Sequence, residues 1–239
     1  VHGLSLAGAL FCKLLKIQYV VGGYRENEPL GGRDPYSASK ACAELVSNAY
    51  RESFFATNNR GPALATARAG NVIGGGDWAY GRLMTDLINS IEFAKPINIR
   101  NPEATRPWQH VLEPLRGYLM LAENLFNEGQ KFSTSWNFGP NSRDVKSVSW
   151  IIEKVSEISK SAIKCNAQSS ISFNEANHLK LDITKAENFL DWRPVLDLSD
   201  ALHMTVDWFE RFYNGADARE ITLSQIHDYQ KRLSLQAEA

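Results

Sequence analysis

The order of apolar and polar residues along the chain predicts an α/β protein. The pattern predicts helices over residues 36–54, 82–93, 112–127, 148–158, 183–190 and 198–213. Short apolar runs between them predict strands over residues 63–69, 96–99, 136–138 and 171–173. Strands that alternate with helices form layers around a mostly parallel sheet, so we expect that architecture. Residues 216–239 are polar, and we expect them to form a frayed tail.

The helix expected from Tyr36 onward has a recognisable start. Asp34 supplies an acidic residue just before it, and Pro35 is compatible with a first helical turn. A turn-rich loop containing two Pro and two Gly, residues 26–35, leads into this helix. Apolar residues spaced by four, three and four positions predict its buried stripe: Ala38, Cys42, Leu45 and Ala49.

Residues 1–21 are the most apolar stretch, but they do not predict a membrane segment. Lys13 and Lys16 interrupt the stretch, and the run before Lys13 is shorter than the ~20 residues that a spanning helix needs. No basic segment precedes it, so a signal peptide is not indicated. We interpret the stretch as a helix or strand of a core, and we expect no membrane partner.

Composition narrows the class of protein further. The chain has 239 residues and a formal net charge of −1, which corresponds to one large or two small domains. The near-zero charge argues against a nucleic-acid partner, which would require clustered Lys and Arg. The 3 cysteines are far apart and odd in number, which excludes a disulfide framework and a Cys-x-x-Cys metal site. This cysteine usage favours a reducing cytoplasm.

Tyr36 and Lys40 have a spacing that suggests chemistry. Residues four apart on a helix lie on one face, about one turn from each other. A tyrosine is a poor base because its free pKa is about 10, but a nearby ammonium favours the phenolate. Such a tyrosinate could take a proton from a sugar hydroxyl while hydride leaves the same carbon. The spacing alone is weak evidence, and an ordinary surface helix is the simpler interpretation.

A glycine-rich segment follows the strand expected over residues 63–69. Residues 70–76 read Gly-Asn-Val-Ile-Gly-Gly-Gly. Open α/β sheets bind ligands where a strand ends in such a loop. We therefore expect a ligand contact in this segment.

Several blocks of sequence resemble one known family. They are GYRENEPLGGRDPYSASKACAELV, ARAGNVIGGGDW, IRNPEATRPWQHVLEPLRGYLMLAE, WNFGP, NEANHLKLD and DWRP. Together they resemble the extended short-chain dehydrogenase/reductase family of nucleotide-sugar enzymes, and within it the 4,6-dehydratases that act on CDP-glucose. The resemblance is continuous over residues 22–215, and the block from Ile99 to Leu115 separates the chain from the epimerases.

The resemblance implies a fold and a division of the chain. The fold would be a Rossmann-like, doubly wound parallel sheet, incomplete because its N-terminal half is missing, with a small C-terminal α/β substrate-binding domain. Residues 1–21 have no match, and residues 22–95 correspond to the C-terminal part of the Rossmann-like catalytic domain. Residues 96–215 are a mixed catalytic and substrate-binding portion, and residues 216–239 are a polar tail.

The resemblance also implies roles for individual residues. Tyr36 and Lys40 match the catalytic pair, which also contacts the cofactor NAD, and Val72 lies on the nicotinamide side. The residues that match substrate contacts are Asn71, Arg82, Ile97, Ile99, Arg106, Asn137 and His178. Arg106 would pair with the diphosphate, to which a fork of charged donors is suited.

Four of these residues allow simpler interpretations. Asn71 could cap a turn, and Arg106 could form a surface ion pair. Asn137 could be a turn residue, and His178 could be a packing histidine.

The implied reaction is dehydration of CDP-glucose to CDP-4-keto-6-deoxyglucose, as used in deoxysugar and lipopolysaccharide biosynthesis. NAD takes hydride from C4 of the hexose, water leaves across C5 and C6, and the hydride returns to C6, so the cofactor is regenerated. The family implies a homodimer of the intact protein, formed through the helix that carries Tyr36 and Lys40.

The sequence departs from the family pattern upstream of Tyr36. No Gly-x-x-Gly-x-x-Gly turn for the pyrophosphate occurs there, and no Asp precedes Asp34. We therefore interpret the chain as an N-terminally truncated dehydratase and expect it to be inactive by itself. The alternatives are an inactive remnant that binds a nucleotide sugar or a partner protomer, and another nucleotide-sugar epimerase or dehydratase.

Overall fold

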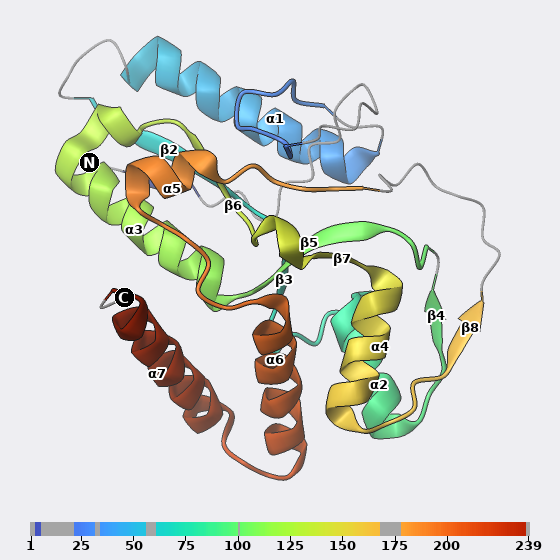
Figure 1. Ribbon diagram of the computed structural model, residues 1–239. Helices are drawn as coiled ribbons and strands as arrows, with labels where there is room; N and C mark the ends of the chain where they lie inside the picture. Colours follow the sequence, from blue (N-terminus) through green and yellow to red (C-terminus); the bar gives the residue numbers. More distant parts are fainter. Residues whose placement is uncertain are drawn as a thin grey trace. The chain divides into compact units, whose positions relative to one another are not determined.

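The computed structural model describes residues 3–5, 22–31, 34–55, 61–99, 101–167 and 178–237 (Figure 1). The chain divides into two compact units. Unit 1 contains residues 1–71, 113–139 and 178–193, and unit 2 contains residues 72–112, 140–177 and 194–239. Each unit is therefore assembled from segments that are far apart in the sequence.

Unit 1 is built on a parallel sheet, as the sequence pattern predicts. Its strands are β1 (Gly3–Ser5), β2 (Leu64–Ala69) and β6 (Ser135–Phe138), in the order β1-β2-β6. The register places Thr66 opposite Ser135 and Arg68 opposite Asn137. The helices of this unit are α1 (Pro35–Tyr50), continued by a π-helical turn (Arg51–Phe55), α3 (Leu112–Glu128), with a 3₁₀ turn (Gly129–Phe132), and α5 (Thr184–Leu190).

One face of this sheet is apolar and forms the core of unit 1. Side chains alternate between the faces of a strand, so Ala65 and Ala67 of β2 share a face with Trp136 and Phe138 of β6. These four residues belong to a buried cluster with apolar residues of α3 and α5. Trp192, which follows α5, packs edge to face on Phe138 with ring centroids 5.1 Å apart.

Unit 2 combines helices with two small sheets of short strands (Figure 1). A sheet of order β3-β5-β7 contains β3 (Asn71–Ile73), β5 (Thr105–His110) and β7 (Val145–Ser147), and β4 (Ile97–Ile99) pairs parallel with β8 (Cys165–Ala167). The helices are α2 (Leu83–Phe93), α4 (Val148–Ser159), α6 (Leu198–Tyr213), α7 (Ala218–Ala237) and a 3₁₀ turn (Ser142–Asp144). Among the described residues, no helix is both long and apolar enough to cross a membrane.

The stripe predicted for the helix from Tyr36 is wrong. The buried residues of α1 are Ser37, Ala41 and Glu44, whereas Leu45 is 56% exposed and Cys42 is exposed. The reason is the polarity of the sheet face that α1 covers, because that face carries Thr66, Arg68, Ser135 and Asn137 rather than apolar side chains. A charged residue, Glu44, therefore faces inward.

The expected frayed C-terminus is also wrong, because residues 218–237 form helix α7. Ile221, Gln225 and Tyr229 of α7 are buried, and Gln225 donates a hydrogen bond to the carbonyl oxygen of Met204 in α6. These three residues recur every four positions, which gives an otherwise polar helix one packing stripe. The strand predicted over residues 171–173 lies outside the described residues.

Gly75 is a residue whose replacement we expect to strain unit 2. A Cβ atom at this position would lie 2.0 Å from Cγ of Trp208, whose ring packs directly on the glycine. Gly75→Ala should therefore destabilise the chain by about 1–3 kcal/mol, since the indole must move. Urea unfolding followed by circular dichroism measures the change. Gly22→Ala is the matched control because its Cβ would meet nothing within 4 Å, and equal stabilities of the two variants would contradict the prediction.

Candidate active site

Tyr36 and Lys40 lie in the first turns of α1, where the local sequence positions them. Asp34 is the N-cap of this helix: its side chain accepts hydrogen bonds from the backbone N–H of Ser37 at 2.9 Å and from the Ser37 hydroxyl at 2.7 Å. The Tyr36 side chain is 52% exposed. The Lys40 ammonium lies 5.6 Å from the centre of the Tyr36 ring. The phenol and the ammonium are therefore side by side at a helix start, available to a ligand.

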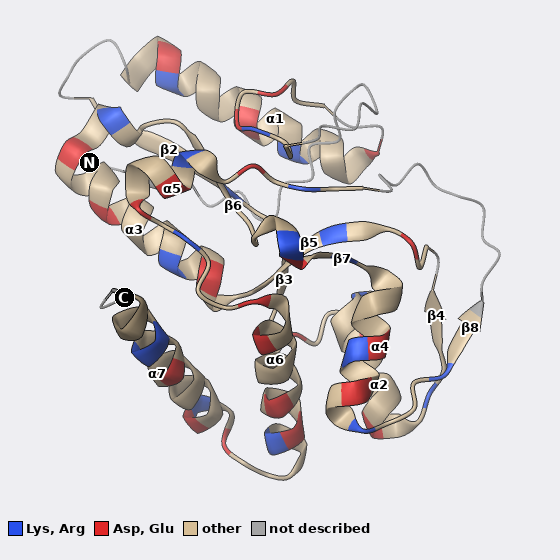
Figure 2. Ribbon diagram, viewed as in Figure 1, with Lys and Arg blue, Asp and Glu red and all other residues tan. Residues whose placement is uncertain are grey.

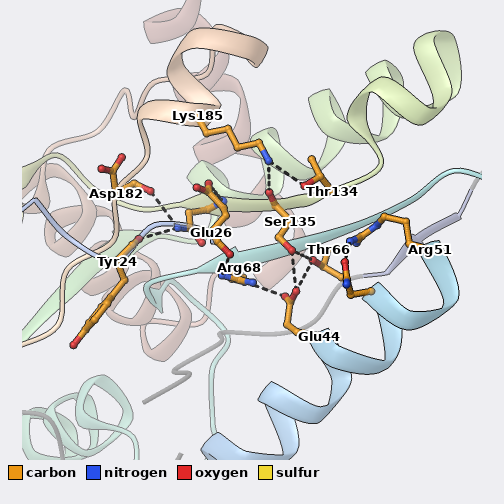
Figure 3. Close-up of polar contacts among 12 residues, drawn as sticks. Tyr24, Glu26, Glu44, Arg51, Thr66, Arg68, Thr134, Ser135, Asp182 and Lys185 are labelled. Atoms are coloured by element: carbon orange, nitrogen blue, oxygen red, sulfur yellow. Dashed lines mark hydrogen bonds and ion pairs between the residues drawn. The ribbon is translucent and has the colours of Figure 1, made fainter. Parts of the chain in front are cut away.

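The turn of α1 that follows Lys40 rests on a buried polar cluster, shown in Figure 3. The carboxylate of Glu44 accepts hydrogen bonds from Arg68 Nε at 3.0 Å, Thr66 Oγ1 at 2.9 Å and Ser135 Oγ at 3.0 Å. The Glu44 and Arg68 side chains are only 2% and 8% exposed. Burial alone would raise the pKa of Glu44, but the charge and hydrogen bonds of Arg68, with the two hydroxyls, hold it below its usual value. Glu44 is thus a buried, ionised carboxylate.

Arg68 also contacts the loop that precedes α1. Its Nη1 donates to the carbonyl oxygen of Glu26 at 3.3 Å, and the Glu26 carboxylate accepts the backbone N–H of Asn137 at 2.9 Å. Burial raises the pKa of Glu26 against the opposing effects of these hydrogen bonds and of the charges on Lys185 and Arg68. The loop, α1 and both strands are therefore joined by one set of polar contacts.

Lys185 of α5 extends to the start of β6, near the same polar cluster. Its ammonium donates to Ser135 O at 2.8 Å and Thr134 Oγ1 at 3.2 Å (Figure 3). The same ammonium lies 4.4 Å from the centre of the Trp136 ring. Burial lowers the pKa of Lys185, partly offset by the charge of Glu26. Lys185 thus holds the start of β6.

Asn137, one of the predicted substrate contacts, lies in the middle of β6 and is 1% exposed. Its amide nitrogen donates to the carbonyl oxygens of Tyr24 and Asp182 at 3.0 and 3.2 Å. Its Oδ1 is buried and has no hydrogen-bond partner among the described residues. The side chain therefore holds two loops together, and only Oδ1 remains for a ligand. His178 is another predicted substrate contact in unit 1, and it is exposed.

Asn71 and Val72 form β3 together with Ile73 and are both half-buried. Oδ1 of Asn71 is buried and, within the part of the chain that the structure describes, accepts no hydrogen bond. An orphaned buried acceptor costs about 1–3 kcal/mol. This cost is relieved if a ligand donates a hydrogen bond there, which agrees with the role expected for Asn71.

The remaining predicted contacts lie in unit 2. Arg82 is the N-cap of α2 and forms an ion pair with Asp77, with Nη1 2.7 Å from Oδ2. Arg106 is half-buried on β5 and donates to the carbonyl oxygen of Thr105. Ile97 is buried in the core of unit 2, and Ile99 packs against that core. The structure therefore brings Tyr36 and Lys40 together, and the ligand-binding roles of all these residues stay predictions.

Sequence reasoning missed Glu26, Glu44 and Arg68. A signal was present: polar residues alternate with apolar ones at 66 and 68 in one strand and at 135 and 137 in the other. Strands of a parallel sheet covered on both faces are usually continuous apolar runs. The alternation therefore marked a polar face, but its partner, Glu44, could be found only from the packing of α1.

His110 is a buried titratable group next to the glycine-rich segment of unit 2. It is 2% exposed, and its Nδ1 accepts the backbone N–H of Leu112 at 3.4 Å. Its Nε2 finds no partner among the described residues, and it would lie 3.8 Å from a Cβ atom at Gly74. Burial lowers the pKa of His110 to about 4.

The shifted pKa of His110 predicts a loss of stability in mild acid. The unfolded chain takes up a proton as the pH falls through about 6.5, whereas folded His110 does not until about pH 4. The free energy of unfolding should therefore fall by about 3 kcal/mol between these values, at 1.36 kcal/mol per pKa unit. Urea midpoints at several pH values measure this change. His110→Gln should flatten the dependence, whereas the exposed-site control His203→Gln should leave it unchanged. A curve as steep in His110→Gln as in the parent would contradict the prediction.

Comparison of the sequence with known proteins shows the family to which the chain belongs. The family model for GDP-mannose 4,6 dehydratase matches residues 18–205. The chain is 47% identical over 212 residues to CDP-glucose 4,6-dehydratase of Salmonella typhimurium, covering 87% of this chain and 59% of that protein. The chain thus spans less than two thirds of the length of this curated relative.

Solved structures of nucleotide-sugar enzymes have a similar fold. The UDP-glucuronic acid 4-epimerase of Bacillus cereus, in complex with UDP-glucuronic acid and NAD, superposes with a TM-score of 0.72 at 21% identity, over 88% of this chain and 62% of that one. The dTDP-glucose 4,6-dehydratase of Bacillus anthracis, in complex with NAD, has a TM-score of 0.65 at 19% identity, over 89% and 62%. These likenesses confirm the expected Rossmann-like α/β class. The chain belongs to the GDP-mannose 4,6 dehydratase family.

Proposed function

We propose that the chain carries the catalytic helix and the sugar-nucleotide side of an NAD-dependent CDP-glucose 4,6-dehydratase. The observation that carries the proposal is the Tyr36–Lys40 pair, exposed at the start of a capped helix, in a chain 47% identical to such an enzyme. The product would be CDP-4-keto-6-deoxyglucose. Free cysteines at positions 42 and 165 agree with a reducing cytoplasm as the place of action.

The residues present fit part of an NAD site. Lys40 is suited to hold the ribose hydroxyls, and Val72 to lie against the nicotinamide ring. A glycine-rich turn for the pyrophosphate does not occur before Tyr36 in this sequence, so these residues cover only the nicotinamide side. When bound, NAD would accept a hydride from C4 of the hexose and return it at C6.

The chain's own residues would supply proton transfer and orientation. The Tyr36 phenolate would take the proton of the C4 hydroxyl, assisted by the adjacent Lys40 ammonium. The resulting 4-ketone acidifies the C5 proton, so that water can leave across C5 and C6. Arg106 would bind the diphosphate, and Oδ1 of Asn71 would accept a hydrogen bond from the substrate.

Turnover tests this proposal. The chain would be assayed alone and joined to the part of the Salmonella typhimurium relative with which it does not align, using CDP-glucose and NAD and following the absorbance of the 4-ketone. We expect turnover by the joined protein and none by the chain alone. Turnover of only UDP-glucose or dTDP-glucose would reject the substrate. A folded joined protein that binds CDP-glucose without turnover would favour the inactive remnant instead.

The outer face of α1 supports the proposal of a homodimer. Leu45, Val46, Tyr50 and Phe54 are between 51% and 65% exposed and recur at helical spacing. A second copy of the chain would bury these side chains against its own α1, at about 25 cal/mol per Å² of apolar surface removed from water. Val46→Glu should therefore shift sedimentation toward the monomer. Leu235→Glu, which changes an exposed apolar residue of α7, is the control, and an unaltered dimer in Val46→Glu would reject this interface.

A further inference from the structure

The sheet face beneath α1 is unusual because it is polar, charged and buried. Thr66 and Arg68 of β2 and Asn137 of β6 are between 1% and 6% exposed, and all point away from the apolar core of unit 1. Burying an ion pair costs desolvation energy that its attraction often fails to recover, so well-packed apolar residues would serve stability as well or better. A role other than stability is therefore required to explain this face.

The contacts of Glu44 restrict how α1 can rotate about its axis. One carboxylate receives three donors, Arg68 Nε, Thr66 Oγ1 and Ser135 Oγ, at 2.9–3.0 Å from two different strands (Figure 3). Hydrogen bonds depend on direction, whereas apolar contacts allow a helix to slide and roll. Glu44 follows Lys40 by one turn and Tyr36 by two, about 12 Å along the axis at 1.5 Å per residue. The rotation set at Glu44 is therefore the rotation that aims Tyr36 and Lys40.

Arg68 acts on both ends of the segment that contains the catalytic pair. Its Nε holds Glu44, which follows Tyr36 and Lys40 in the chain. Its Nη1 holds the carbonyl oxygen of Glu26, which precedes them. Glu26 is in turn held by the backbone N–H of Asn137. One planar guanidinium thus connects the entry loop and the helix to the same strand, which the single ammonium of a lysine cannot do with the same geometry.

We propose that Arg68, together with Glu44, is a positioning device for catalysis: the pair fixes the rotation of α1 and its entry loop so that Tyr36 and Lys40 face the substrate. The importance of this orientation of Tyr36 and Lys40 for catalysis rests on the proposed dehydratase function. Arg68 and Glu44 act on Tyr36 and Lys40 through the helix, because Glu44 belongs to α1 and Arg68 holds it.

The decisive variant replaces the pair by apolar residues of similar size, Glu44→Leu with Arg68→Met. Apolar residues of similar volume often replace a buried ion pair without loss of stability, so we expect the urea midpoint to stay close to that of the parent. If the Glu44–Arg68 pair has no positioning role, α1 also keeps its rotation in this variant. If the pair positions α1, the helix loses its fixed rotation. The matched control is Asp200→Leu with Arg232→Met, which removes an ion pair from the surface of unit 2.

The rotation is measured on the chain itself, without substrate. Spin labels on Cys42 of α1 and on a cysteine in place of Asn127 of α3 report the distance between two exposed sites of unit 1, with Cys12 and Cys165 changed to Ser. We expect one narrow distance distribution in the parent and in the control, and a shifted or broadened one in the Glu44→Leu/Arg68→Met variant. If that variant does not fold, Arg68→Lys, which keeps the charge but not the fork, takes its place with the same expectation.

Turnover of the joined protein gives the second readout. A displacement of about 1 Å at a catalytic group can cost about 100-fold in rate, so we expect kcat to fall by about that factor with KM nearly unchanged. Unchanged distance distributions in the folded variants would overturn the positioning role, whatever the turnover. Altered distributions with no turnover by the parent joined protein would reject the dehydratase function while leaving the role of Arg68 in orienting α1 supported.

Discussion

Tyr36→Phe should lower kcat of the joined protein by about 10²- to 10⁴-fold, the usual contribution of a positioned proton-transfer group. The change removes one hydroxyl from a side chain that is 52% exposed at the start of α1, so neither folding nor substrate affinity should change much. The effect should therefore fall on kcat and leave KM within about threefold, the pattern expected when an interaction acts in the transition state. Initial rates of 4-ketone formation from CDP-glucose measure it.

Tyr50→Phe is the matched control for this prediction. Tyr50 lies on the same helix and is 51% exposed, so the two variants lose the same atom from similar surroundings. Only Tyr36 has the Lys40 ammonium beside its ring. Equal activities of the two variants would reject Tyr36 as the proton acceptor.

Glu44→Ala should have the largest effect on stability, a loss of about 3–5 kcal/mol. The substitution leaves the Arg68 guanidinium buried without its carboxylate, and it removes the acceptor of the Thr66 and Ser135 hydroxyls. A single charge stranded in the interior costs more than the intact pair contributes, which is why removing one partner is harsher than removing both. Urea unfolding at neutral pH, followed by circular dichroism, measures the change.

Two further variants make this prediction specific. Glu44→Gln keeps the size of the side chain and a carbonyl acceptor, so its loss should be smaller than that of Glu44→Ala. Glu123→Ala removes an exposed carboxylate from α3 of the same unit and should change stability by no more than about 0.5 kcal/mol. A loss below about 1 kcal/mol in Glu44→Ala would show that water or the chain replaces the carboxylate easily.

Local signals in the sequence were enough to predict most helices and the start of α1. Asp34 caps that helix and Pro35 is its first residue, as the sequence indicates, because capping depends on neighbours in the chain. Helix α6 begins at Leu198 and ends at Tyr213, as predicted. The helix α7 was missed because its polar composition hides a stripe of only three buried residues, and those pack on a helix elsewhere in the unit.

The inward face of α1 shows where sequence patterns fail. Leu45 was predicted to be buried and Glu44 was not considered, yet the structure buries Glu44 and exposes Leu45. Helical periodicity identifies apolar stripes on the assumption that the partner surface is apolar. Here the partner surface is the polar side of β2 and β6, brought into register by the pairing of Thr66 with Ser135.

The sequence by itself determined the elements, the capped start of α1 and the one-turn spacing of Tyr36 and Lys40, because these depend on residues close together in the chain. The tertiary structure alone decided which face of α1 is buried, and with it the buried ion pair of Glu44 and Arg68, one turn beyond Lys40. Those contacts join residues 22 or more positions apart, and 91 apart for Ser135 and Glu44. Residues so far apart in the sequence are brought together by strand register and helix packing, which no local pattern specifies.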